Sequence, residues 1–176
     1  MATEQNTTLE GLKTAIQMEI DGKQFYLKAS QKSSNEAGKK LLTELAAEED
    51  IHRQKFEEIF ESIRDKNAWP AVSFKSDGGS HLRTLFSRAI GQAGKSFRAL
   101  DSELGAVQTA VDMEGKTYDF YINQGLSTSY PAAREFYEAL SAQEREHQLI
   151  LLDYQEFLKD PNGWFVGKEH PTLDGG

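Results

Sequence analysis

The sequence predicts an all-α protein, an antiparallel four-helix bundle with one long crossover between its second and third helices. Four long segments repeat apolar residues at alternating steps of three and four, which gives each predicted helix one apolar face. Only a few turn residues separate the first helix from the second, and the third from the fourth. Roughly thirty residues join the second helix to the third, which is enough to cross the bundle from end to end and make these two helices parallel.

The first hairpin is marked by capping residues. Thr7-Thr8-Leu9-Glu10 has the Thr-x-x-Glu form of a capping box, so the first helix is expected over about residues 8–31. Ser33-Ser34-Asn35-Glu36 repeats this device, and the second helix is expected over about residues 34–67. The turn between the two helices is therefore expected at about residues 30–35.

The crossover is expected over residues 68–101. Trp69-Pro70 and Asp77-Gly78-Gly79 are typical of loops. From His81 to about Phe97 the sequence predicts a shorter helix with an imperfect apolar pattern. This segment lies in the part of the chain that has to return along the bundle.

The second hairpin is bounded by proline and glycine. The third helix is expected over about residues 102–125, where it ends at a glycine. The fourth is expected over about residues 130–160, with Pro131 just inside its start. The tail, residues 161–176, begins with Pro-Asn-Gly and is expected to be irregular, with Trp164-Phe165 packed on the bundle or on a second subunit.

Composition limits the function classes. The 176 residues are long enough to bury a core and are most simply one domain. No run approaches the ~18 apolar residues of a membrane span, and the start of the chain does not resemble a signal peptide, so we expect a cytoplasmic protein. The absence of cysteine excludes thiolate zinc sites, iron–sulfur clusters and disulfides from these residues. A net charge of −8 without a basic cluster argues against nucleic acid or an anionic membrane as partner.

Two Glu-x-x-His motifs carry the chemistry. Glu49 and His52, like Glu144 and His147, are spaced so that both side chains project from one face of a helix. Both pairs stand in apolar seams, where a charged group needs a partner. The seams read Leu42, Leu45, Glu49, His52, Phe56 and Tyr137, Leu140, Glu144, His147, Leu151.

Each motif has a further glutamate 30 residues upstream on an apolar seam, Glu19 and Glu114. In an antiparallel hairpin with ~1.5 Å rise per residue, the upstream glutamate and the motif reach the same level. The offsets also repeat internally, since Phe25-Tyr26 follows Glu19 as Phe120-Tyr121 follows Glu114. The sequence therefore predicts one metal site built from Glu19, Glu49, His52, Glu114, Glu144 and His147.

Oxygen and imidazole ligands without sulfur fit two ions of iron or manganese, with zinc possible. Four carboxylates would neutralise two divalent ions. The spacing leaves the bridging ligands open, either Glu49 with Glu114 or Glu114 with one glutamate of the second or fourth helix. Such a site is suited to a reaction in which dioxygen or peroxide accepts electrons. Folding is expected to be coupled to metal binding.

Other polar residues near the motifs receive less specific predictions. Tyr26, Tyr118 and Tyr121 could donate hydrogen bonds to the ligands or relay electrons, but core packing with a satisfied hydroxyl is favoured. Residues expected to face solvent are Glu48, Glu146, Asp21, Asp50 and Asp112. His81 and His170 are expected to have surface or capping roles.

Over about residues 8–160 the two motifs and their 30-residue spacings resemble the ferritin-like di-iron carboxylate superfamily, and most closely its rubrerythrin-related branch. The resemblance implies a ferritin-like bundle in which the six residues hold two iron ions. Two features differ from that family. Thr117 stands where rubrerythrins carry a further glutamate three residues beyond the third-helix ligand, and the cysteines of a rubredoxin-like iron site are missing.

The resemblance implies a non-haem di-metal oxidoreductase that reduces peroxide or dioxygen with electrons from an external donor protein. The alternative is a ferritin-like iron-oxidising, iron-storing or iron-handling protein. A structural bundle with a vestigial site is a weaker interpretation, because all six ligand residues are present. We also expect a homodimer, with no nucleic-acid or membrane partner.

Overall fold

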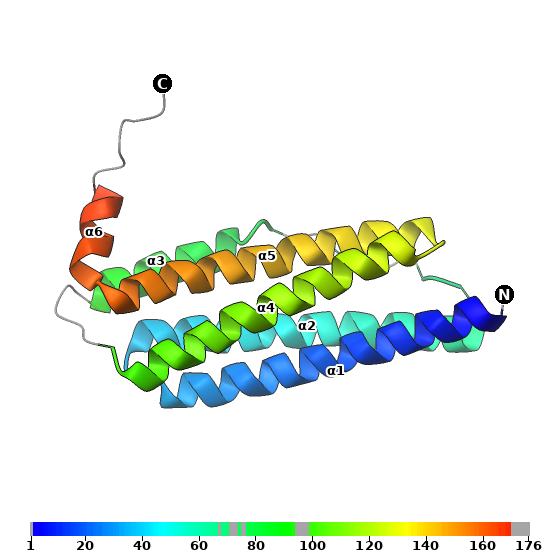
Figure 1. The fold of residues 1–176 in the computed structure, drawn as a ribbon, viewed down its shortest axis with the longest axis horizontal. Coiled ribbons are helices and arrows are strands. Elements are labelled where there is room, and N and C mark those ends of the chain that lie inside the picture. The colour runs from blue at the N-terminus through cyan, green and yellow to red at the C-terminus, as the bar shows by residue number, and fades with distance from the viewer. Residues whose placement is uncertain (1, 67, 71–73, 75–76, 94–98, 170–176) are drawn as a thin grey trace, which may run out of the picture.

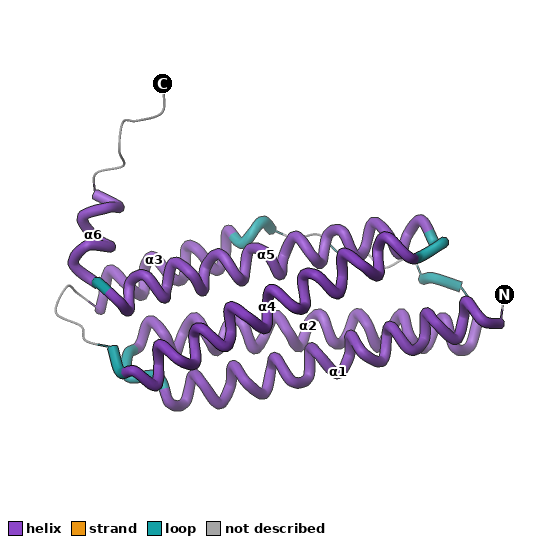
Figure 2. The backbone as a smooth tube through the Cα atoms, in the orientation of Figure 1, coloured by secondary structure: helices purple, strands orange, loops and turns teal. Residues whose placement is uncertain are grey.

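Two long helical hairpins build the bundle in the computed structural model, which describes residues 2–66, 68–70, 74, 77–93 and 99–169 (Figure 1). Over these residues the structure is all-helical and contains no strand. Its helices are α1 (Ala2–Lys32), α2 (Glu36–Lys66), α3 (Ser80–Ala93), α4 (Asp101–Ser127), α5 (Pro131–Lys159) and α6 (Pro161–Glu169). Figure 2 shows that short turns at opposite ends join α1 to α2 and α4 to α5.

The crossover makes α2 and α4 parallel, as predicted. In Figure 1 both helices run from the left end of the bundle to the right end, and α3 returns towards the end where α4 begins. The side of α3 that faces the bundle buries Leu82, Phe86 and Ile90, and the Phe86 ring meets Tyr154 of α5 at a centroid distance of 5.7 Å. The ferritin-like arrangement with one long crossover is therefore confirmed.

The α1–α2 turn depends on a close approach of α5. Asn35 caps α2, since the Gly38 N–H donates to Asn35 Oδ1 at 2.7 Å. A Cβ atom at Gly38 would lie 2.1 Å from the hydroxyl oxygen of Tyr154. Buried Glu103 of α4 accepts hydrogen bonds from Asn35 Nδ2 at 3.1 Å and from the Tyr154 hydroxyl at 2.9 Å. The turn is thus joined to both helices of the second hairpin.

The starts of α1 and α2 differ from the predictions, and α4 runs to Ser127 instead of ending at Gly125. α1 begins six residues before residue 8, because its first turns find tertiary partners: Gln5 Nε2 donates to the Ile63 carbonyl at 2.8 Å. The Thr7–Glu10 capping box is therefore not used. At α2 the cap is Asn35 rather than Ser33, whose hydroxyl bonds to Glu103 instead.

The tail was predicted to be irregular, and this was wrong for residues 161–169, which form α6. Asp160 begins the helix by accepting the Gly163 N–H at 3.0 Å. Trp164 then packs on the bundle, with its ring 5.8 Å from that of Phe157 and its Nε1 donating to Asp153 Oδ1 at 2.8 Å. Residues 170–176, including His170, lie outside the described residues.

The core consists of two apolar clusters with a polar layer between them. One cluster lies towards the α1–α2 turn and includes Leu45, Val107 and Leu151. The other lies towards the α4–α5 turn and includes Phe56 and Leu140. Within the described chain we find no helix with the length and apolar character that crossing a membrane requires.

Candidate metal centre

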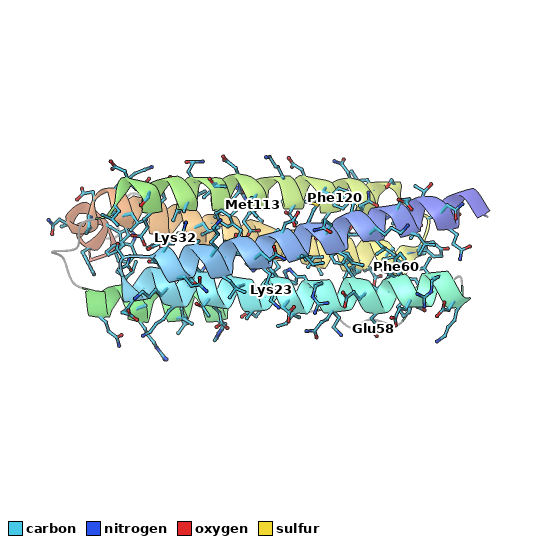
Figure 3. All side chains as sticks on the ribbon, turned by 90° about the horizontal axis from the view of Figure 1, so that it is seen from below. Lys23, Lys32, Glu58, Phe60, Met113 and Phe120 are labelled. Atoms are coloured by element: carbon cyan, nitrogen blue, oxygen red, sulfur yellow. The ribbon has the colours of Figure 1, made fainter. Side chains whose placement is uncertain are left out.

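All six residues predicted to form the site meet in the polar layer. Glu19 comes from α1, and α4 supplies Glu114. Each Glu-x-x-His motif projects both of its side chains inward from α2 or α5, as its seam position predicts. At most 4% of any of the six residues is exposed. Figure 3 shows Lys23, a charged residue off the seams, between α1 and α2, where it pairs with Asp50 at 2.8 Å.

The first group of potential ligand atoms surrounds His52. Its Nδ1 lies 3.1 Å from Glu144 Oε1, 3.5 Å from Glu19 Oε2 and 3.7 Å from Glu49 Oε2. One ligand atom from each of these four residues lies within 4.8 Å of the others. They are close enough together to surround one ion.

The second group surrounds His147. Its Nδ1 lies 3.5 Å from Glu49 Oε1, 3.6 Å from Glu144 Oε2 and 3.7 Å from Glu114 Oε1. These four residues also offer ligand atoms within 4.8 Å of one another. The two imidazole rings are nearly parallel, with an interplanar angle of 13° and centroids 5.8 Å apart.

Glu49 and Glu144 belong to both groups, each with one oxygen near each histidine. Glu19 and Glu114 belong to one group each. The sequence-based interpretations of bridging both included Glu114, whereas the structure places the two motif glutamates between the groups. This arrangement follows the pseudo-two-fold symmetry of the two hairpins.

The inward-facing atoms fit a pair of metal ions. Buried polar atoms nearly always have hydrogen-bond partners. In this layer seven buried atoms have none among the described residues: Glu19 Oε2, Glu49 Oε1, both Glu144 oxygens, His147 Nδ1 and both His52 nitrogens. All except His52 Nε2 belong to the contacts within the two groups. Carboxylate oxygen and imidazole nitrogen without sulfur are the donors that iron, manganese and zinc accept.

In the metal-free protein the pKa values of the six site residues are shifted in different directions. Burial, followed by the charge of Glu49, raises the pKa of Glu19 and of Glu114 well above the usual value. For Glu49 and Glu144, burial acts to raise the pKa, but contacts that include both histidines outweigh this effect. Both pKa values are therefore lowered, and that of Glu144 is about 2.

Burial lowers the pKa of each imidazole, and the surrounding carboxylates more than reverse this, so both histidine pKa values are raised. In the metal-free layer these shifts favour protons on Glu19, Glu114 and both imidazoles, and they favour the carboxylate form of Glu49 and Glu144.

Two tyrosines bond to the glutamates in a crossed pattern. The Tyr26 hydroxyl donates to Glu114 Oε1, and the Tyr121 hydroxyl donates to Glu19 Oε1. Each tyrosine lies seven residues after the glutamate of its own helix and bonds to the glutamate of the other helix. Burial and the neighbouring glutamate raise the pKa of both hydroxyls, which keeps them protonated as donors. Among the described contacts Tyr118 makes no such bond, so the donor interpretation holds for two of the three tyrosines.

Sequence reasoning missed Glu48, which was expected to face solvent. Its Oε2 lies 2.9 Å from His147 Nε2 and also accepts a hydrogen bond from Gln143 Nε2. Glu146, expected to be solvent-facing too, is half-buried and pairs with Arg83 of α3. A signal for Glu48 was present in the internal repeat, because Glu48 and Gln143 are the residues directly before the two motif glutamates.

Thr117 supplies no inward oxygen. Its hydroxyl donates to the Met113 carbonyl of its own helix at 3.1 Å. His81 of α3 is exposed, and its Nε2 lies 2.9 Å from Glu44, consistent with the expected surface role. Over the described residues, the buried polar groups of the layer are the six residues and the side chains that bond to them.

The fold and the buried layer define the class of four-helix-bundle proteins in which carboxylates and imidazoles from facing helices are placed to hold metal. The rubrerythrin family model matches residues 10–155, and the chain belongs to the rubrerythrin family. The match includes all six predicted site residues and the crossover. Searches of curated proteins and of solved structures returned no match.

Proposed function

We propose that the protein is a rubrerythrin-like di-iron oxidoreductase, which reduces peroxide or dioxygen with electrons from an external donor protein. The observation that carries the proposal is the pair of four-residue groups with two shared carboxylates and unpartnered atoms facing inward. Membership of the rubrerythrin family supports iron as the metal. A cytoplasmic location and a homodimer belong to the same proposal.

In this proposal Glu19 and His52 would hold one ion and Glu114 and His147 the other, and both motif glutamates would be available to each ion. Bound iron would supply one-electron redox chemistry and an open position for the oxidant. The identity of the six ligands stays a prediction until metal is located.

The residues around the layer exclude water from it and hold two of its glutamates in place. The apolar clusters on either side exclude water, which strengthens every electrostatic interaction inside. Tyr26 and Tyr121 hold Glu114 and Glu19 in place and keep one hydroxyl proton beside each carboxylate. Within these 176 residues no cysteine is available for a sulfur-bound iron site, and delivery of electrons by a separate protein is part of the proposal.

The alternative is iron oxidation with storage or handling of the product. Thr117 weakens the case for peroxide reduction and leaves iron oxidation and oxygen reduction equally open, because that helix position contributes no additional carboxylate to the layer. Single-turnover spectroscopy separates the two functions. Re-reduction of the oxidised site by a donor protein supports the oxidoreductase, whereas accumulation of ferric iron in a large assembly supports storage.

The ligand assignment is tested by loading the apoprotein with Fe²⁺ under anaerobic conditions and counting ions per chain. The wild type is expected to bind two. Glu49→Ala removes an oxygen from both groups and is expected to lose both ions, while Glu19→Ala is expected to retain one. Glu58→Ala, an exposed change on α2, is the control and keeps two. A wild type that binds fewer than two ions contradicts the proposal.

A further inference from the structure

The internal repeat of the two motifs is broken at one position. The residue before the motif glutamate is Glu48 on α2 and Gln143 on α5. If the pseudo-two-fold symmetry were complete, each of these residues would serve the histidine of the opposite motif. Instead, Gln143 Nε2 donates to Glu48 Oε2, so both side chains act at the same histidine.

The contact with Glu48 determines which nitrogen of His147 can bind metal. A carboxylate only accepts, so His147 Nε2 carries the proton across the 2.9 Å contact. A neutral imidazole then has its lone pair on Nδ1, the nitrogen that faces Glu49, Glu114 and Glu144. Glu48 is itself held, since its side chain is only 15% exposed and Gln143 bonds to the same oxygen.

His52 has no such support. Its Nε2 is buried and has no hydrogen-bond partner among the described residues. The nearest ring is that of Phe74, which meets the imidazole edge-on with centroids 5.6 Å apart and an angle of 71°. A phenyl ring cannot accept the Nε2 proton as a carboxylate does, so none of the residues that the structure describes fixes the His52 tautomer or strengthens its Nδ1 as a donor.

We propose that Glu48 is a positioning residue for His147, and that it makes the metal position at His147 bind more tightly and fill before the position at His52. The inference rests on the proposed di-metal site and adds an order of loading. A carboxylate behind a ligating imidazole fixes the orientation of the ring and increases its basicity, and its loss typically weakens metal binding by about 10- to 100-fold. The effect falls on one of the two ions because, within the described part of the chain, only His147 has such a carboxylate partner.

The test is a Co²⁺ titration of the full-length apoprotein, followed by calorimetry and visible absorption. The wild type is expected to show two resolved binding steps. Glu48→Ala should weaken the tighter step by about 10- to 100-fold and leave the weaker step nearly unchanged. Glu48→Gln keeps an acceptor oxygen but not the charge, so its loss should be smaller. Glu61→Ala removes the same charge from an exposed position of α2 and should change neither step.

Location is tested by anomalous diffraction from crystals loaded with one equivalent of Co²⁺, where the signal should concentrate beside His147. Two equal binding steps in the wild type, or equal weakening of both steps in Glu48→Ala, would overturn the inference and leave the di-metal site standing. Fewer than two Co²⁺ ions per wild-type chain would instead remove the proposed site itself. Circular dichroism of each apoprotein checks folding, and the nearly isosteric Glu48→Gln carries the test if Glu48→Ala does not fold.

Discussion

Metal binding is expected to expel protons from the buried layer. In the metal-free protein Glu19 and Glu114 have raised carboxyl pKa values and both imidazoles have raised pKa values, so up to four protons occupy positions that metal ions require. Each proton released adds about 1.36 kcal/mol per pH unit to the pH dependence of binding. With all four released, the free energy of binding two ions changes by about 5 kcal/mol per pH unit.

The assay is calorimetry of Zn²⁺ binding at pH 6 in buffers with different ionisation enthalpies, which yields the number of protons released. We expect at least the two imidazolium protons, and up to four, with the number falling as the pH rises through the raised pKa values. Glu58→Ala serves as a control with an unaltered layer. Binding heats that do not depend on the buffer would refute the charge distribution inferred for the metal-free site.

Three further predictions concern stability. Because the pKa values of Glu19, Glu114 and both histidines are raised in the folded apoprotein, protonation of these groups stabilises the folded state. This stabilisation is fully present below the ordinary pKa of each group, 6.5 for histidine and 4.5 for glutamate. It is lost as the pH rises through the raised pKa of the folded state. The apoprotein melting temperature should therefore fall from pH 6.5 upward, while the metal-loaded protein should gain stability relative to it; parallel curves would contradict this. Tyr26→Phe leaves the buried Glu114 Oε1 without its donor and should lower the free energy of unfolding by about 1–3 kcal/mol in urea titrations. Gly38→Ala forces a Cβ against Tyr154 and should cost about 1–3 kcal/mol while metal stoichiometry stays at two.

The inward direction of the six site residues was predictable because the apolar seams specify which face of each helix is buried. Their common level followed from the equal 30-residue spacings on two antiparallel hairpins. The start of α1 was not predictable in this way. The local capping signal at Thr7 competes with a tertiary bond from Gln5 to the end of α2, and a single sequence does not show that bond.

Glu48 shows the limit of reasoning from periodicity. It is adjacent to Glu49 and therefore lies about 100° around the helix from the seam. At that angle a side chain faces either solvent or a neighbouring helix, and the outcome depends on the rotation of α2 relative to α5. Only the structure shows that His147 and Gln143 lie on that side.

The buried layer also explains why metal should determine how stably the bundle folds. Replacing a buried charged cluster with apolar residues of similar volume is often neutral or stabilising, so this layer does not improve stability by itself. In the metal-free layer the raised pKa values of Glu19, Glu114 and both imidazoles favour their protonated forms, and seven buried atoms have no hydrogen-bond partner among the described residues. Ions that bind only the folded chain would satisfy six of those atoms and link the four long helices at one level. Removing the metal should therefore lower the melting temperature of the whole bundle, because every long helix contributes at least one residue to the layer.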